Sequence, residues 1–210
     1  MIKYFDNNDD IKEYIKNLAI KNVGKGTEGQ VWLTKENDTI KYVLKAFRQT
    51  YKPSMLTEDD IKLESFIFPT EIFVENGFVA GYRARYFKDD IFNKMDTKTG
   101  SVINLEKLAI AREKMIKDIE VLTKAKYKIE DIENNLLFDG KRLVAIDTLD
   151  YPKINNIELY ENIELLDYAI ITRLVLIDSR VKRLQDSSFD EIVDYLADKD
   201  VFELTIPRMK

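Results

Sequence analysis

Three glycines and one lysine are the residues whose types and spacing could bind a phosphate chain. Gly24, Gly26 and Gly29 are three of the chain's seven glycines, and they open an alternating apolar run. Because glycine has no side chain, backbone N–H groups at such a turn can approach phosphate oxygens closely. Lys45 ends the next alternating run, residues 40–45, and would reach the same phosphates as a point charge. We expect a phosphate-binding loop here, the alternative being an ordinary turn.

Two further side chains could hold a divalent cation. Asn135 and Asp147 flank a predicted β-hairpin, and Asp147 directly follows the wholly apolar residues 143–146. A carboxylate after a buried strand is costly unless it is paired or binds a metal. Mg²⁺ prefers oxygen ligands of this kind, together with phosphates. The alternative for Asn135 is a loop residue that caps its own backbone, and Asn134 is the alternative in a shifted register.

Composition excludes several classes of chemistry. The chain has no histidine and no cysteine, so Ser-His-Asp triads, HExxH zinc sites and disulfides are excluded. Acid–base catalysis must then use carboxylates, lysine or tyrosine. The formal net charge of −5, with basic residues scattered among acids, predicts no nucleic-acid partner. No apolar run resembles a signal peptide or a membrane span, so we expect no membrane partner and a cytoplasmic location, with delivery into another cell left open.

The elements that must position these residues change character along the chain. Residues 7–19 have the spacing of a capped amphipathic helix, and residues 20–48 that of three short strands with a hairpin turn at 36–38. Residues 57–66 begin like a capping box and predict a short helix. Residues 71–87 predict another hairpin, turned at Glu75-Asn76-Gly77.

The second half is mainly helical. A long helix is predicted after an Asn104 cap, and further helices toward the C-terminus. Two short strands joined by an Asp139-Gly140 turn interrupt them. The predicted helices are residues 104–126, 160–184 and 188–198, and the strands are 136–138 and 143–146. The sheet-rich half thus precedes a helix-rich half, with a hinge expected at Tyr86–Asp90.

At this point the residues resemble the protein kinase-like fold. Residues 24–31 are similar to the family's glycine-rich loop, GxGxxGxV, and residues 42–45 to its strand-three lysine motif. Glu64, on the helix predicted at 57–66, stands where the family's helix-C glutamate would pair with Lys45. The resemblance assigns the loop and its lysine to the nucleotide: Gly24, Lys25, Gly26, Thr27, Gly29, Val31 and Lys45.

Residues 130–137 are similar to the family's catalytic loop, an aspartate followed by four residues, an asparagine and two apolar residues. Counting back from Asn135 without a gap puts Glu130 at the position of the catalytic base, whereas Asp131 requires a one-residue deletion. Both carboxylates therefore remain candidates for the base. Asp147 stands at the position of the DFG aspartate, so the resemblance makes Asn135 and Asp147 the metal ligands.

The resemblance runs from about residue 20 to residue 151 and implies a fold of class α+β with two lobes. The N-terminal lobe, 1–87, would hold an N-terminal helix, the glycine-rich loop, an antiparallel sheet and helix C. The reduced, mainly helical C-terminal lobe, 88–210, would hold the catalytic and metal-binding loops. No histidine precedes the base, Leu149 replaces the DFG glycine, and no APE motif follows. The chain thus looks like the minimal, atypical kinases found in bacteria and among bacterial effectors.

The resemblance implies an ATP- and Mg²⁺-dependent phosphotransferase that moves the γ-phosphate to a hydroxyl, most simply a Ser/Thr-type protein kinase with an unidentified protein substrate. One alternative is a pseudokinase that binds nucleotide and serves as an interaction module, which the irregular loop Glu130–Asn135 and Leu149 favour. A small-molecule kinase of the aminoglycoside or choline type ranks lower, because such enzymes normally have a larger helical half.

Overall fold

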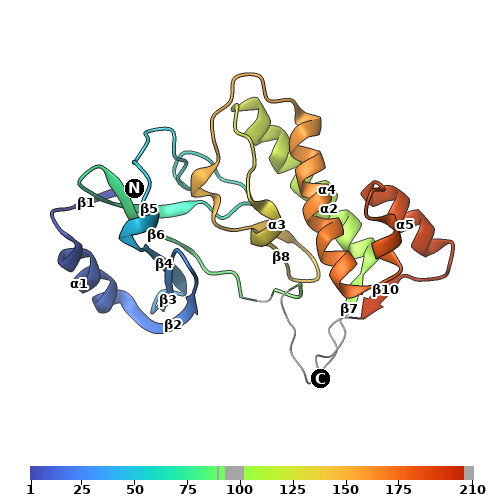
Figure 1. Cartoon of the computed structure of the whole chain (residues 1–210), viewed down its shortest axis with the longest axis horizontal. Coiled ribbons are helices and arrows are strands. Elements are labelled where there is room, and N and C mark those ends of the chain that lie inside the picture. Colours follow the sequence, from blue (N-terminus) through green and yellow to red (C-terminus); the bar gives the residue numbers. More distant parts are fainter. Residues whose placement is uncertain (89, 93–101, 206–210) are drawn as a thin grey trace. The chain divides into compact units, whose positions relative to one another are not determined.

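The computed structural model describes residues 1–88, 90–92 and 102–205 (Figure 1). Over these ranges the chain forms a mixed α/β structure with a six-stranded, mainly antiparallel sheet and several helices. It folds as two compact units. The first comprises Met1–Lys62, Ile67–Lys88 and Thr148–Asp150, and the second Leu63–Phe66, Asp89–Asp147 and Tyr151–Lys210. One of the boundaries between the units follows Lys88, and Asp89 lies outside the described residues, so the hinge at Tyr86–Asp90 stays a prediction.

The sheet of the first unit has the strand order β1-β5-β6-β4-β3-β2, in which β1 and β5 are parallel and all other neighbours antiparallel. The strands are β1 (Ile2–Phe5), β2 (Ala19–Lys25), β3 (Gly29–Thr34), β4 (Asp38–Val43), β5 (Pro69–Glu75) and β6 (Phe78–Arg85). The three strands predicted at 20–48 and the hairpin at 71–87 are confirmed. Asn76 and Gly77 turn that hairpin with φ of 52° and 80°, the left-handed values that a two-residue turn needs.

Helix α1 (Asn8–Leu18) covers one face of this sheet and confirms the helix predicted at 7–19. Asn7 begins it, its side chain accepting hydrogen bonds from the backbone N–H groups of Asp9 and Asp10. The buried residues Ile11 and Ile15 face the sheet. They pack in one apolar cluster with three buried strand residues, Ile40, Phe73 and Ala80.

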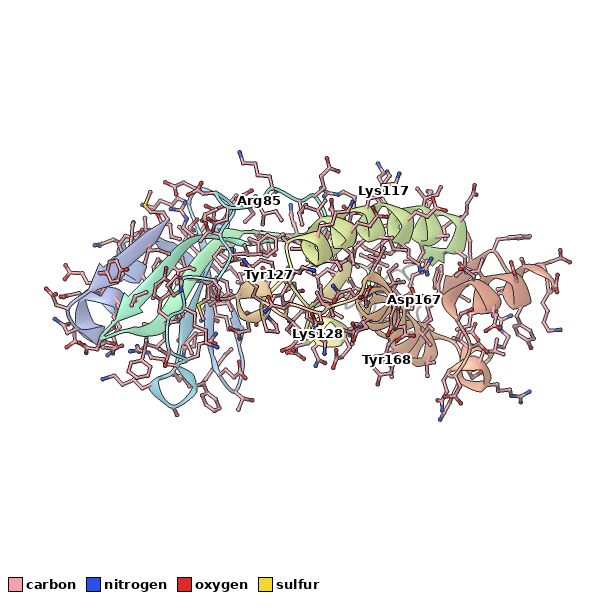
Figure 2. All side chains as sticks on the ribbon, turned by 90° about the horizontal axis from the view of Figure 1, so that it is seen from above. Arg85, Lys117, Tyr127, Lys128, Asp167 and Tyr168 are labelled. Carbon is pink, nitrogen blue, oxygen red and sulfur yellow. The ribbon has the colours of Figure 1, made fainter. Side chains whose placement is uncertain are left out.

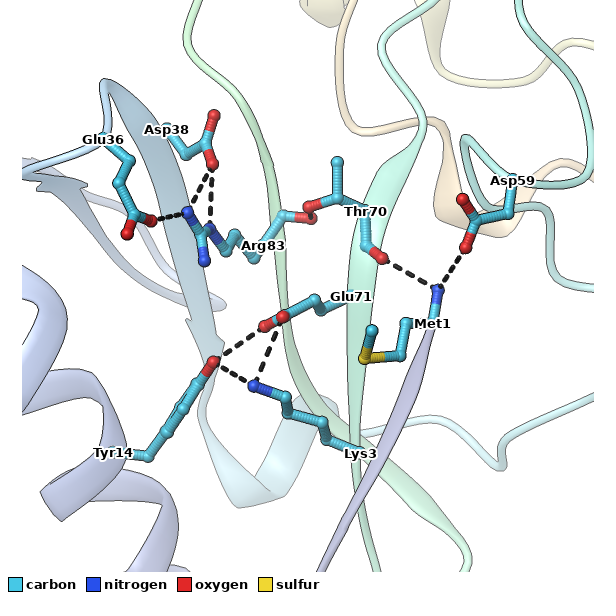
Figure 3. A network of polar contacts seen from close by, with 9 residues as sticks. All are labelled: Met1, Lys3, Tyr14, Glu36, Asp38, Asp59, Thr70, Glu71 and Arg83. Atoms are coloured by element: carbon cyan, nitrogen blue, oxygen red, sulfur yellow. Dashed lines mark hydrogen bonds and ion pairs between the residues drawn. The ribbon is translucent and has the colours of Figure 1, made fainter.

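Polar contacts attach β1 and α1 to the neighbouring strand β5 (Figure 3). Lys3 of β1 donates to the hydroxyl of Tyr14 on α1, and this hydroxyl donates to Glu71 of β5 at 2.8 Å. The Lys3 ammonium also lies 3.2 Å from Glu71. Strand β1 was not predicted, because residues 2–5 are too few for an alternating pattern to stand out.

The helix predicted at 57–66 is wrong. The capping contact forms, with Thr57 N and Oγ1 both donating to Asp60 Oδ2 at 2.8 Å, but only a turn follows at 58–60. Residues 66–68 are consecutive, apolar and buried, which an extended chain allows and one face of a helix does not. Pro69 also disfavours helical backbone in the residue before it.

The second unit is built on two long helices, α2 (Leu105–Lys124) and α4 (Leu159–Ile177), which lie side by side. An ion pair joins them: Arg112 Nε lies 2.6 Å from Oδ1 of Asp167, which is labelled in Figure 2. The helix predicted at 104–126 is confirmed, with Asn104 Oδ1 accepting from Lys107 N at 2.9 Å. The helix predicted at 160–184 ends at Ile177 instead, and a short 3₁₀ segment, η3 (Val181–Leu184), follows it.

Smaller elements complete the second unit. The hairpin of β8 (Leu136–Phe138) with β9 (Leu143–Ala145) and the helix α5 (Phe189–Ala197) were predicted and are confirmed. Two strands too short to show a pattern, β7 (Val102–Asn104) and β10 (Glu203–Thr205), pair with each other. The helix α3 (Ile132–Asn135) is the remaining short element of the second unit. The 3₁₀ segments η1 (Lys45–Phe47) and η2 (Thr148–Asp150) belong to the first unit. Within the described ranges, no helix combines the length and apolar character needed to cross a bilayer.

Candidate active site

The glycine-rich residues form the tip of the β2–β3 hairpin. Lys25 of β2 pairs with Gln30 of β3, and the backbone N–H of Gly26 donates to Gly29 O at 2.9 Å. The carbonyl of Glu28 accepts from Leu44 N at 2.8 Å, which ties the tip to the chain that follows β4. Both strands next to the tip are therefore held at this end of the sheet.

The packing of the strands requires glycine at only one of the three positions. A Cβ on Gly29 would lie 2.1 Å from the carbonyl oxygen of Tyr42 on β4, so the packing of the strands itself requires glycine there. A Cβ on Gly24 would meet nothing closer than 3.8 Å, and one on Gly26 nothing within 4 Å. The fold thus explains Gly29 but leaves open space beside Gly26, where a ligand could approach the backbone.

Lys41 is the lysine that contacts this hairpin. It lies inside β4, directly opposite Val31 of β3 on one side and Tyr82 of β6 on the other. Its Nζ is 3.9 Å from Glu28 Oε2 and 5.8 Å from the centre of the Tyr82 ring. The side chain is 19% exposed, so it lies along the sheet face rather than in bulk water. Lys41 was not among the residues predicted to contact the nucleotide, because Lys45 was expected to end the same strand nearer the phosphates.

Lys45 does not end a strand as predicted. Strand β4 ends at Val43, and Lys45 begins the exposed 3₁₀ segment η1. The alternating run predicted over residues 40–45 therefore stops two residues before Lys45. Lys45 lines a small cavity of about 270 Å³ together with Arg48, Glu75, Asn76 and Phe78. Of the other predicted nucleotide residues, Lys25 and Thr27 are exposed and Val31 is half-buried.

Glu64, the predicted partner of Lys45, lies on the segment Leu63–Phe66 of the second unit and is exposed. The segment bends at Glu64 and Ser65, and Phe66 forms an isolated bridge with Ala145. Its Ser65 donates its backbone N–H to Asp118 Oδ2 of α2 at 2.8 Å and accepts from Ala145 N of β9 at 2.8 Å. Glu64 is thus not on a helix as predicted, and its pairing with Lys45 of the first unit stays a prediction.

The predicted catalytic loop is tightly cross-linked within the second unit. Asp131 precedes α3 with φ of 51°, a left-handed conformation that aspartate and asparagine tolerate better than most residues. Asn134 Nδ2 donates to Asp131 Oδ1 at 3.0 Å. Asn135 Nδ2 donates to the Asp131 carbonyl at 3.0 Å and to its Oδ2 at 3.4 Å. Arg173 of α4 donates to Asn134 O at 3.2 Å and anchors the loop from outside.

Asp147 lies on the other side of the β8–β9 hairpin and has the same unusual backbone, with φ of 58°. The N–H of Ile146 donates to Asn135 O at 3.0 Å, so a hydrogen bond joins the two loops. The hairpin predicted from residues 136–146 therefore brings Asn135 and Asp147 to one end of the same small sheet, as their flanking positions suggested.

Tyr151 is a buried residue whose phenol is affected by the charges of both loops. Its side chain is buried, and burial raises the pKa of its phenol well above the ordinary value. The negative charges of Asp147 and Asp131 raise this pKa further. Glu130, the alternative base, is exposed and makes none of the contacts that hold Asp131. The geometry thus favours Asp131.

The oxygen atoms of this cluster fit a hard divalent cation. Asp147 supplies a carboxylate, and because the amide nitrogen of Asn135 is bound to Asp131, its amide oxygen is the atom left to face a cation. Among the described residues, no group of three or more carboxylates is close enough to bind a metal alone. Two protein oxygens fit Mg²⁺, which keeps waters and binds substrate phosphates as its other ligands.

Asn162 holds the start of the catalytic loop and was missed by the sequence reasoning, because one asparagine inside a helix gives no pattern. It is fully buried on α4. Its Oδ1 accepts from Ile129 N at 2.9 Å, and its Nδ2 donates to Thr123 Oγ1 at 2.9 Å and to the carbonyl of Tyr127 at 3.1 Å (Tyr127 is labelled in Figure 2). These bonds fix the chain just before Asp131.

We expect Asn162→Leu to lower the free energy of unfolding by about 3 kcal/mol, because it leaves several buried polar groups without hydrogen bonds. Urea denaturation measures the change. Asn155→Leu, at an exposed position in the turn before α4, is the matched control and should change stability little. Equal stability of the two variants would contradict the positioning role.

No protein-family model matches the chain, and no curated protein is similar to it. Among solved structures, the twitchin kinase fragment of C. elegans, described as an autoregulated protein kinase with immunoglobulin domains, matches with 13% sequence identity and a TM-score of 0.45. The match covers 70% of this chain and 34% of that structure, so the chain spans about a third of its length.

Proposed function

We propose that this protein is an ATP- and Mg²⁺-dependent phosphotransferase of the protein kinase-like type. The observation that carries the proposal is the linkage of Asp131, Asn135 and Asp147 in the second unit: Asn135 donates to Asp131, and Ile146, the residue before Asp147, donates to Asn135. An asparagine and two aspartates in this arrangement offer oxygen ligands for a cation and a separate carboxylate for an acceptor. The transferred group is the γ-phosphate of ATP and the acceptor a hydroxyl.

Each residue has a stated role. Asn135 and Asp147 would bind Mg²⁺, and the bound cation would neutralise negative charge on the phosphates. Asp131 accepts the proton of the acceptor hydroxyl and orients that hydroxyl. The backbone at Gly24–Gly29 contacts phosphate oxygens, and Lys41 or Lys45 adds a positive charge. We propose a serine or threonine side chain of a protein as the acceptor, because an exposed Asp131 leaves room for a polypeptide.

Incubation with γ-labelled ATP and Mg²⁺, alone and with casein, tests the proposal. We expect label on the chain itself or on casein, and no label when EDTA replaces Mg²⁺. If neither label transfer nor ADP release is found, and if Mg²⁺-ATP does not raise the melting temperature, the proposal is wrong.

A nucleotide-binding module without turnover is the second candidate. Both carboxylate oxygens of Asp131 already accept hydrogen bonds from Asn134 and Asn135, so an acceptor hydroxyl would have to share these oxygens with the two amides. Leu149, which stands where the resemblance expects glycine, is buried and limits backbone movement after Asp147. Thermal stabilisation by Mg²⁺-ATP without any label transfer would favour this candidate.

The two lysines separate in a binding experiment. We expect Lys41→Met to weaken binding of Mg²⁺-ATP at least about tenfold, because a hydrogen bond to a charged group contributes about 1.5–3 kcal/mol. Lys45→Met should have the smaller effect, since Lys45 lies on an exposed turn after β4 has ended. Titration of a fluorescent ATP analogue measures both affinities. A larger loss of affinity in Lys45→Met than in Lys41→Met would assign the phosphate contact to Lys45.

A further inference from the structure

A second cavity lies in the first unit, between α1 and the strands β2 to β4. Its volume is about 670 Å³, which is within the range of small-molecule sites, about 300–1,000 Å³. Its wall is formed by helix α1, by the start of β2, and by residues of β3 and β4 on the sheet face that α1 covers. The lining residues are Lys12, Ile15, Lys16, Ala19, Ile20, Lys21, Asn22, Gln30, Trp32, Tyr42 and Leu44.

The cavity uses the opposite sheet face from the proposed phosphate site. Successive residues of a strand point to opposite faces. Trp32 and Tyr42 line the cavity, whereas their neighbours Val31 and Lys41 belong to the face with Tyr82. The two sites therefore share strands but no side chains of those strands.

The aromatic wall of the cavity is held in place. The hydroxyl of Tyr42 donates to Asn8 Oδ1 at 2.7 Å, and Arg48 donates to the same atom at 2.7 Å. The Arg48 guanidinium also lies 5.6 Å from the centre of the Tyr42 ring. Trp32 packs against the apolar cluster beneath α1. The wall is thus a fixed surface rather than a set of mobile side chains.

Two apolar side chains at the cavity are left in contact with water. Ile20 is 55% exposed and Leu44 is 39% exposed. Each could lose apolar surface to a bound hydrocarbon, which stabilises a complex by about 25 cal/mol per Å² removed from water. The cavity therefore offers aromatic and aliphatic walls against which the apolar part of a ligand can pack.

The charge of the lining is one-sided. It includes three lysines and no aspartate or glutamate, although acids outnumber bases 38 to 33 in the whole chain. Lys12 also contacts Asp9 at 3.2 Å, outside the cavity lining. Lys16 belongs to the last turn of α1 and Lys21 to β2, so cationic groups reach the cavity from both of its sides.

We propose that this cavity binds a small anionic amphiphile, with a carboxylate or another acidic head group on the lysines and an aliphatic or aromatic body on Trp32, Tyr42 and Ile15. The proposal is independent of the phosphotransferase function, since it uses none of the residues placed in that site. A neutral or cationic molecule of the same body would leave the lysine charges uncompensated and bind more weakly.

The chain's single tryptophan reports on the cavity directly, because Trp32 is part of its lining. We expect decanoate, added below its micelle concentration, to change Trp32 emission in a saturable way with one site per chain. Decyltrimethylammonium at equal concentrations should give a much smaller change, and acetate none. Isothermal titration calorimetry gives the same dissociation constant if the emission change reports binding.

Paired lysine variants decide the matter. We expect Lys16→Gln with Lys21→Gln to weaken decanoate binding about tenfold, which corresponds to about 1.4 kcal/mol. Lys35→Gln with Lys52→Gln removes the same charge from exposed positions of the first unit outside the cavity, and should leave binding unchanged. Equal loss in both pairs, equal binding of the cationic probe, or no saturable heat would overturn the proposal.

Discussion

Replacing Asp147 with asparagine is expected to reduce phosphoryl transfer about a thousandfold while the fold stays intact, because removal of even one preorganised hydrogen-bond donor from an active site typically costs about 10²–10³ in rate. Asparagine has the same shape and tolerates the left-handed backbone that Asp147 adopts, with φ of 58°. The charge of one metal ligand is therefore the main thing lost. Initial rates of label transfer at saturating ATP and Mg²⁺ measure the effect.

Asp200→Asn is the matched control for this experiment. Asp200 is exposed, and its φ of 55° gives it the same left-handed backbone outside the proposed site. Both variants should melt within a few degrees of the parent chain. Full activity in Asp147→Asn would remove Asp147 from the proposed metal site, and an equal loss of activity in Asp200→Asn would show that the effect is not specific to that site.

Gly29→Ala is expected to lower the free energy of unfolding by about 3 kcal/mol, because overpacking of a tight site costs about 1–3 kcal/mol and here the obstacle is main chain. The added Cβ would lie 2.1 Å from Tyr42 O, so β3 or β4 must move. Gly26→Ala places its Cβ in open space and should leave stability within about 0.5 kcal/mol, as do most substitutions away from packed features. Urea denaturation compares the two.

The same pair also tests the ligand side of the hairpin. If backbone N–H groups near Gly26 contact phosphate, then Gly26→Ala should weaken ATP binding without a change in stability. Unchanged affinity in Gly26→Ala would assign the glycine pattern to the turn alone. A Gly29→Ala protein as stable as the parent would contradict the close approach of β3 to β4.

Local patterns predicted most of the elements, because a cap or a turn residue acts over a few neighbours. Asn104 caps α2, and Asn76-Gly77 turns the β5–β6 hairpin, as their sequence context indicated. Strands β7 and β10 were missed because they are short and pair across a long stretch of chain. At 57–66 a local cap was present, but burial of the apolar residues that follow it overrode the cap.

The candidate site was predictable in part. The hairpin after Asn135 was evident from its two apolar runs, and it carries Asp147 back to Asn135. The contact of Lys41 with Glu28 depends on the register of β4 against β3, which pairs Lys41 with Val31, and register is set by pairing rather than by composition. Tyr151 and Asn162 are buried among segments that are distant in the sequence. The spacing of residues along the chain therefore could not predict their roles.

The left-handed backbone at Asp131 and Asp147 has a consequence for ligand binding. Such a conformation costs on the order of 1 kcal/mol or more in a residue other than glycine. The hydrogen bonds from Asn135 to Asp131 and from Ile146 to Asn135 offset this cost when the chain folds. The loops are thus preorganised, and a ligand that binds there does not have to order them. We expect its affinity to carry little entropic penalty from this part of the chain.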